Sequence, residues 1–272
     1  MDAATVPAVP VLDAGGIARL RDVLAGGYLA DEADRKLAGS LLARWPGTAA
    51  LVTDANEFHR RAATWAVAEG AAGVVFAAAG YPLEGGFHEA AAAQQPKALF
   101  AYAEAAQIPS MYNQALLGAR DPLRVCARLG SARDPAGLLS MPAVQAILDR
   151  GPVMVQLQLC CHWWPGEFCE WALGEYRRLL RKRAPGSTLA LSVVIPGAAD
   201  GAGEFMASMS RAGGTVYSHT ESDVAGWIAA AGLGLAPPDV MDVRGRGLDW
   251  AAAEFSRQRT VARAIEAIAV VP

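Results

Sequence analysis

The sequence has few cysteines, no excess of basic residues and no long hydrophobic run. Four Cys in 272 residues are too few for a disulfide scaffold, and the adjacent pair Cys160 and Cys161 is poorly placed for a mutual bridge. The chain has 24 Lys+Arg against 27 Asp+Glu, a net charge of -3, and therefore lacks the positive charge that nucleic acids attract. No apolar stretch reaches the length of a bilayer span, and no basic segment followed by an apolar core opens the sequence. These absences predict a cytoplasmic protein with reduced thiols that binds neither nucleic acid nor membrane.

The 272 residues, of which 53% are hydrophobic, are enough for one globular domain with a full core. Residues 1–16 contain prolines and glycines without periodicity, so we expect a flexible lead-in. Apolar residues then recur at spacings of three and four in residues 17–24 and 32–44, which predicts two amphipathic helices. Asp54 is a candidate N-cap of a third helix that ends near Gly70.

After Gly70, short apolar runs alternate with helical stretches. Four such runs, rich in small or β-branched residues, cover residues 73–79, 99–103, 153–159 and 188–195. Buried strands that alternate with helices indicate an α/β fold with a parallel sheet and helices on both faces. Thr220 and Asp223 form a typical start of a later helix, and residues 264–271 are a candidate last strand. Parallel sheets of this kind bind ligands at the carboxyl ends of their strands.

Five sequence segments occur in a recognisable order and spacing. They are Ala18-Arg19-Leu20 with Asp22, Leu24 and Gly26-Gly27; Asp34-Arg35; Gly80-Tyr81-Pro82 with Gly85 and His88-Glu89; His162 after an apolar strand; and Pro185-Gly186-Ser187 with Leu189, Leu191 and Ser192. Together they resemble a bacterial SAM-dependent methyltransferase family, known mainly from actinomycetes and long catalogued as a domain of unknown function.

This resemblance implies a class I methyltransferase fold, which is Rossmann-like, with a seven-stranded, mostly parallel sheet and an N-terminal helical cap over the active site. Residues 17–272 would form the single domain, with the cap at 17–70 and the Rossmann-like core at 71–272. The resemblance also implies SAM as cofactor. It points to Gly80, Pro82, Gly85 and His88 as cofactor-binding residues, and Glu104 is a fifth candidate because it stands next to the aligned ribose-binding position.

The cofactor motif departs from the family at several positions. The family's first turn begins with an acidic residue followed by Gly-x-Gly, but the matching residues here are Phe76, Ala78 and Gly80. The ribose-binding Asp of the family aligns with Ala103, although Glu104 stands next to it. A methyl group on Ala78 narrows the backbone approach that a nucleotide needs. We therefore expect no cofactor, while SAM binding through backbone contacts stays open.

The segment from Gln156 to Trp171 contains most of the candidate chemistry. His162 should lie at the carboxyl end of its strand, where an imidazole serves as a general acid or base, or equally as a structural residue. Trp163 and Trp164 offer flat apolar surfaces for a substrate, with core packing as the alternative. The nearby cysteines lack the paired spacing of a zinc site, so we expect no metal.

Five candidate residues complete the predicted crevice. Glu104 and Tyr28 are candidate catalytic residues beside His162, and Tyr28 stands where the family has a polar residue under the cap. The substrate-binding candidates besides the two tryptophans are Tyr81, Asp22 and His219. Gln156 and Gln158 place amides on one face of a buried strand, where they need hydrogen-bond partners.

We expect a methyltransferase-fold enzyme with a decayed SAM site that acts on a small, largely apolar molecule of secondary metabolism. Cyclisation, cycloaddition, isomerisation or elimination would fit, because these reactions need a bound reactive conformation and one or two proton or charge groups. Two alternatives stay open: a working SAM-dependent O-, N- or C-methyltransferase, and a non-catalytic partner of an active enzyme. The expected partner is a small-molecule substrate, and a homodimer is left open.

Overall fold

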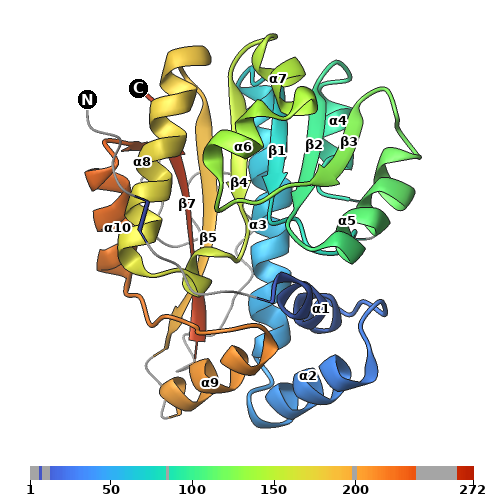
Figure 1. Cartoon of the computed structure of the whole chain (residues 1–272), viewed down its shortest axis with the longest axis vertical. Helices are drawn as coiled ribbons and strands as arrows, with labels where there is room; N and C mark the ends of the chain where they lie inside the picture. The colour runs from blue at the N-terminus through green and yellow to red at the C-terminus, as the bar shows by residue number, and fades with distance from the viewer. Residues whose placement is uncertain (1–5, 8–12, 84–85, 198–200, 237–261) are drawn as a thin grey trace.

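A seven-stranded sheet forms the centre of the molecule (Figure 1). The computed structural model describes residues 6–7, 13–83, 86–197, 201–236 and 262–272. The strand order is β3-β2-β1-β4-β5-β7-β6, and only β7 runs antiparallel to its neighbours among the described strands. This confirms the predicted class I methyltransferase fold. The strands are β1 (Gly73–Ala77), β2 (Leu99–Glu104), β3 (Val125–Leu129), β4 (Val153–Leu157), β5 (Thr188–Pro196), β6 (Gly234–Leu235) and β7 (Ala262–Val270).

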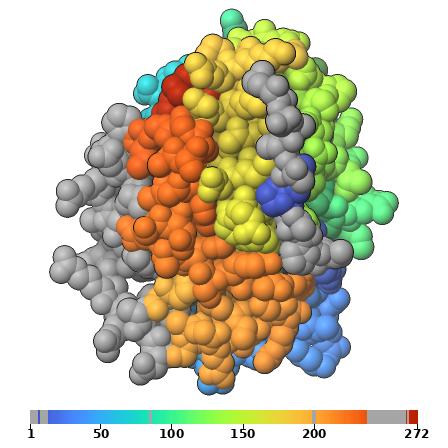
Figure 2. Space-filling view, turned by 60° about the vertical axis from the view of Figure 1, so that its left-hand side comes forward, coloured from blue at the N-terminus to red at the C-terminus, as the bar shows by residue number. Residues whose placement is uncertain are grey.

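Helices cover both faces of the sheet. The helix α3 (Thr48–Ala68) packs on one face with α4 (Glu89–Gln94), through an apolar cluster that includes Phe58, Phe76 and Phe100. The other face is covered by α6 (Pro135–Ser140), α7 (Pro142–Leu148), α8 (Gly166–Arg183) and α10 (Glu221–Ala230). Figure 2 shows α8 in yellow beside α10 in orange. The α5 helix (Gln107–Asn113) lies against β2 and β3.

The N-terminal helices α1 (Ala14–Leu24) and α2 (Glu32–Arg44) lie with α9 (Ala202–Met209) below the sheet in Figure 1. The α1 helix begins three residues earlier than predicted, because the Asp13 side chain accepts the Gly16 N–H and caps it. Asp54 is not an N-cap, since α3 already begins at Thr48. The longer α3 contacts α1, α2 and four strands, and so joins the cap to the sheet.

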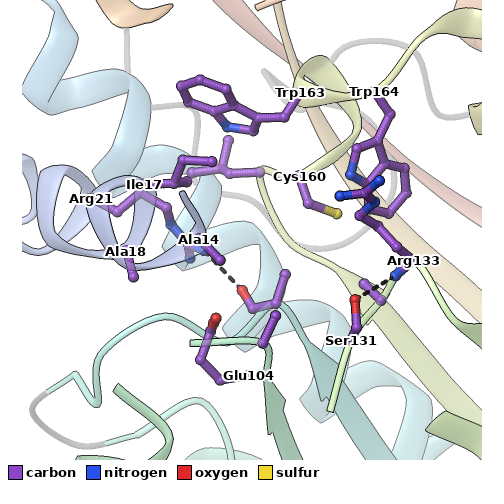
Figure 3. A pocket seen from close by; sticks show the side chains of 14 residues that line it. Ala14, Ile17, Ala18, Arg21, Glu104, Ser131, Arg133, Cys160, Trp163 and Trp164 are labelled. Atoms are coloured by element: carbon purple, nitrogen blue, oxygen red, sulfur yellow. Dashed lines mark hydrogen bonds between the residues drawn. The ribbon is translucent and has the colours of Figure 1, made fainter. Parts of the chain in front are cut away.

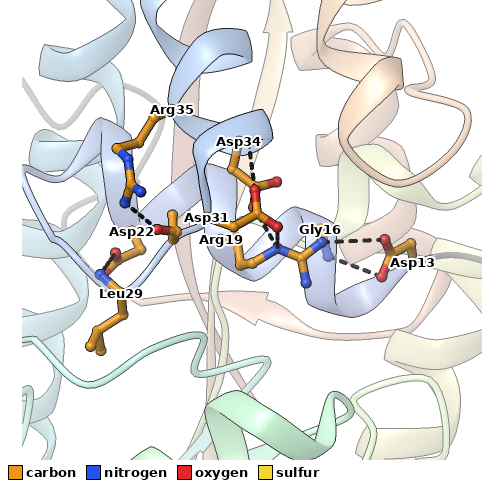
Figure 4. Close-up of polar contacts among 9 residues, drawn as sticks. Asp13, Gly16, Arg19, Asp22, Leu29, Asp31, Asp34 and Arg35 are labelled. Atoms are coloured by element: carbon orange, nitrogen blue, oxygen red, sulfur yellow. Dashed lines mark hydrogen bonds and ion pairs between the residues drawn. The ribbon is translucent and has the colours of Figure 1, made fainter.

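Polar contacts fix the connection between α1 and α2 (Figure 4). Asp22 accepts the Leu29 N–H at 2.7 Å, and a Cβ atom at Gly27 would lie only 2.1 Å from Asp22 Oδ1. Only glycine fits at this turn without movement of the carboxylate. Arg19 contacts Asp34 at 2.5 Å and so ties the two helices together.

The later elements follow the sequence pattern in part. Thr220 and Asp223 form the predicted capping box at the start of α10. The last strand is present as β7 and begins two residues before the predicted position. The strands β3 and β6 had no prediction from the sequence. Among the described helices, none has the length and apolar composition that a membrane span requires.

Candidate functional site

A cavity lies at the carboxyl ends of the parallel strands, beside α1 (Figure 3). Its volume is about 220 Å³. The walls come from α1, from the turn after each of four strands and from the two tryptophans after β4; they include Ile17, Arg21, Ala78, Glu104, Arg133, Cys160, Trp163 and Trp164. This is the position at which an open α/β sheet binds its ligands. We refer to this cavity as the crevice.

Arg21 ties α1 to the sheet inside the crevice. Its Nη1 donates to the Ala78 carbonyl at 2.8 Å and lies 3.4 Å from the Gln158 carbonyl. Burial lowers the pKa of Arg21, and the negative charge of Glu104 opposes that shift. Arg21 is not among the site residues predicted from the sequence. A signal existed, because Ile17, Arg21 and Leu24 follow the helical spacing of four and three and place a cation on the apolar stripe of α1.

Glu104 ends β2 and lies at the wall of the crevice, with 5% of its surface exposed. Its Oε2 accepts the Gly80 N–H at 2.7 Å, and its Oε1 accepts the Ala106 N–H at 3.0 Å. Burial raises the pKa of Glu104, while these two hydrogen bonds and Arg21 act in the opposite direction. A carboxyl group with a raised pKa at a ligand cavity is suited to proton transfer.

Two turns of the crevice adopt left-handed backbone conformations without glycine. Ala78, which follows β1, has a φ of 57°, and Leu159, which follows β4, has a φ of 47°. Such conformations are strained for residues with a Cβ atom and are concentrated at functional sites. Ala78 stands at the position where the resembled family has its first glycine. The left-handed backbone conformation that favours glycine is therefore present here, although the residue is alanine.

His162 does not line the crevice. It is 2% exposed and borders a separate cavity of about 20 Å³, because residues 161–163 form a tight helical turn that directs Trp163 toward the crevice. Its Nδ1 accepts the Val194 N–H at a long 3.4 Å. Burial, with the positive charge of Arg21, lowers the pKa of His162 to about 3. The imidazole is therefore neutral near pH 7, and its surroundings are those of a structural residue.

Trp163 and Trp164 line the crevice, and each is 2% exposed. The Trp163 Nε1–H has no hydrogen-bond partner among the described residues. His219 lies behind the crevice wall, where its Nε2 contacts the Trp164 carbonyl at 2.9 Å and its ring packs against Trp227. His219 thus supports the position of Trp164 and does not line the crevice itself.

The remaining candidates of the cap lie outside the crevice. Tyr28 is 82% exposed on the turn before α2, so the structure does not place it under the cap. Asp22 is buried, and its carboxylate holds the turn between α1 and α2. Tyr81 lines, with Gly80 and Asp22, a cavity of about 10 Å³ that Arg21 also borders.

The predicted cofactor residues do not lie together: Gly80 is next to the crevice, whereas His88 lies at the start of α4 beside Tyr102. Gly80 donates its N–H to Glu104 and lies against the Arg21 guanidinium, which would be 3.4 Å from a Cβ atom at this position. His88 packs under α4, where its Nδ1 contacts the Tyr102 hydroxyl at 2.9 Å, and burial lowers its pKa to about 4. Pro82 does not line the crevice. Gly85 lies outside the described residues.

The amides of Gln156 in β4 and of Gln158 just after it have partners on α3. Gln156 Oε1 contacts His59 Nδ1 at 3.2 Å, its Nε2 donates to the His59 carbonyl at 2.9 Å, and Gln158 Nε2 donates to Asn56 Oδ1 at 2.7 Å. These side chains therefore connect a helix to the sheet and do not face the crevice. Within the described ranges, no group of three or more His, Cys, Asp or Glu is arranged to hold a metal ion.

The sheet order, the cap and the crevice define a protein of the class I methyltransferase fold. The sequence profile of the S-adenosyl methyltransferase family matches residues 12–271, and the chain belongs to that family. A crystal structure of a candidate methyltransferase from Thermobifida fusca is similar, with a TM-score of 0.79, 22% identity and 94% of each chain covered. A DUF574 family protein from Streptomyces avermitilis has a TM-score of 0.78 and 23% identity, with 94% of this chain and 97% of that chain covered. No curated protein matches the chain.

As the side chains are arranged, the groups in the crevice fit SAM only in part. SAM has a positively charged sulfonium, which the Arg21 guanidinium inside the crevice would repel, and a carboxylate, which the same guanidinium could bind. Like charges repel strongly where apolar walls replace water. The volume of about 220 Å³ also falls below the roughly 300–1,000 Å³ of sites that take drug-sized ligands. Glu104 also suits SAM, because a carboxylate at the end of the second strand can accept hydrogen bonds from ribose hydroxyls.

Proposed function

We propose that this member of the S-adenosyl methyltransferase family is a small-molecule enzyme that works without SAM and transfers a proton in the crevice. One observation carries the proposal: the guanidinium of Arg21 is hydrogen-bonded to the Ala78 carbonyl, between the ends of β1 and β4. A fixed cation at this place disfavours a sulfonium and favours a reaction in which negative charge develops.

Among the four reaction types expected from the sequence, isomerisation and elimination agree best with the groups in the crevice. Glu104 would accept a proton from a substrate carbon, and Arg21 would stabilise the negative charge that develops on the substrate. In an isomerisation, the electron pair shifts a double bond and the same carboxyl returns the proton to another carbon. In an elimination, the electron pair expels a leaving group. His162 has no part in either route, because it lies outside the crevice.

Calorimetric titration of the native chain with SAM and with S-adenosylhomocysteine tests the proposal. The expected result is no binding of either compound up to millimolar concentration, and no such compound in mass spectra of the purified protein. Binding of SAM at micromolar concentration would overturn the proposal.

The second candidate is a SAM-dependent methyltransferase of a small molecule. The observation that favours it is the position of Glu104, which lines the crevice at the end of β2, in a chain that belongs to the S-adenosyl methyltransferase family. In this function Arg21 would pair with the carboxylate of SAM, and the sulfonium would lie away from the guanidinium. Micromolar SAM binding that is lost in a Glu104→Ala variant would support this candidate.

A further inference from the structure

Two N–H donors in the crevice have no acceptor. Among the described residues, nothing accepts a hydrogen bond from Trp163 Nε1 or from Arg21 Nε. Trp163 is 2% exposed, and Figure 3 shows its indole nitrogen on the side of the ring toward Ile17 and Cys160. A buried donor without an acceptor is costly in free energy. Because both groups are donors, the group that would satisfy them is an acceptor.

The charge in the crevice specifies this acceptor further. No ion pair joins Arg21 to a carboxylate of the described chain, whereas Arg19 on the same helix contacts Asp34 at 2.5 Å. Both oxygens of the nearby Glu104 carboxylate already accept backbone N–H groups. A second cation, Arg133, also lines the crevice. This arrangement favours an anionic ligand over a neutral or cationic one.

We infer that the crevice binds a small carboxylate with a flat, unsaturated body, whose carboxylate oxygens accept from Arg21 and Trp163 while the flat part lies beside Trp164. The inference rests on the proposed function of the crevice and names its substrate class. It also changes the expectation of a largely apolar substrate, since one end of the ligand is charged.

The size and lining of the crevice favour a carboxylate over a phosphate. A dianion would leave a negative charge uncompensated near Glu104, in a space whose other walls include apolar groups such as Ile17. The indole rings offer flat surfaces, against which a planar ligand loses little conformational freedom. The volume of about 220 Å³ is small and therefore suits a compact molecule.

Cinnamate and its neutral amide, cinnamamide, are matched probes, because they share the planar body and differ in the charged group. Calorimetry should show cinnamate binding to the native chain about tenfold or more tightly than cinnamamide, the range expected for a charge-assisted hydrogen bond. Arg21→Met should remove this preference by weakening cinnamate alone. Trp163→Phe, which keeps an aromatic ring and lacks the N–H, should weaken cinnamate several-fold.

Arg44→Met is the matched control, since Arg44 is an exposed residue of α2 that pairs with Glu204 away from the crevice. This variant should bind both probes as the native chain does. Equal affinity for the two probes, no binding of either probe, or displacement of cinnamate by equimolar inorganic phosphate would each overturn the inference. If Arg21→Met does not fold, Trp163→Phe still tests the inference. The SAM titration is separate, so SAM binding would overturn the proposed function whatever the probes show.

Discussion

The Nη1 atom of Arg21 lies 2.8 Å from the carbonyl oxygen of Ala78, and this contact joins the N-terminal cap to the end of β1. The two residues are 57 positions apart in the chain. The hydrogen bond places a cation inside the crevice of an S-adenosyl methyltransferase family member, at the turn where the resembled family has a glycine. The next two predictions test each partner of this contact.

Arg21→Ala should open the crevice to SAM. The change removes a side chain and a positive charge, and it frees the carbonyl of Ala78 for a ligand. We expect affinity for SAM to rise by about tenfold or more, equivalent to about 1.4 kcal/mol. Calorimetry of the variant and the native chain measures this difference. An exposed control, Arg44→Ala, should leave the affinity unchanged, and equal affinity in all three proteins would contradict the prediction.

Ala78→Gly should stabilise the protein by about 1 kcal/mol, because glycine adopts the φ of 57° without the strain that a Cβ atom causes. Urea denaturation measures the free energy of unfolding. Ala79→Gly is the neighbouring control, since Ala79 is buried and has no positive φ. That change should destabilise the protein by about 1 kcal/mol. A lower stability for Ala78→Gly would show that the turn is not strained.

Much of the fold could be predicted from the sequence because it depends on local patterns. Four short apolar runs predicted four of the strands, and the Thr220–Asp223 pair predicted the start of α10. The strand β3 was missed because Arg128 and Leu129 face solvent at the sheet edge and interrupt the apolar run. The start of α3 was misplaced because the helix begins at Thr48 after Gly47, without a side-chain cap.

The candidate site was harder to predict, because it depends on where side chains point in the folded protein, and the sequence pattern does not specify this. Glu104, Trp163 and Trp164 could be found, since they follow directly from the ends of β2 and β4. His162 was placed in the crevice wall, but the turn at residues 161–163 directs it toward α3 and α9. Arg21 was missed because its role arises from a contact with a distant turn.

Acid should destabilise the protein through three buried histidines. Burial lowers the pKa of His59 and His162 to about 3 and that of His88 to about 4, each from 6.5. The unfolded chain binds these protons below pH 6.5 while the folded chain does not, so stability is full above pH 6.5 and is lost as pH falls. The contribution of the three histidines to this loss should approach about 4 kcal/mol per pH unit between pH 6 and 4. Urea denaturation at a series of pH values measures this slope.

The His88→Gln variant measures the contribution of one histidine to this pH dependence of stability. Glutamine can still contact the Tyr102 hydroxyl but does not titrate, so the slope between pH 6 and 4 should fall by about 1.4 kcal/mol per pH unit. A slope equal to that of the native chain would mean that His88 does not contribute to acid unfolding.

Ser192→Ala should destabilise the protein by about 2–3 kcal/mol, since one hydroxyl serves two buried groups. Gln156 Oε1 can only accept, so His59 Nδ1 donates to it and His59 Nε2 accepts from the Ser192 hydroxyl at 2.9 Å. The same oxygen accepts the Leu159 N–H at 3.0 Å and so holds the strained turn after β4. Ser40→Ala, an exposed serine of α2, should change stability by less than about 0.5 kcal/mol. If the two variants unfold at the same urea concentration, the polar contacts between α3 and the sheet do not stabilise the fold.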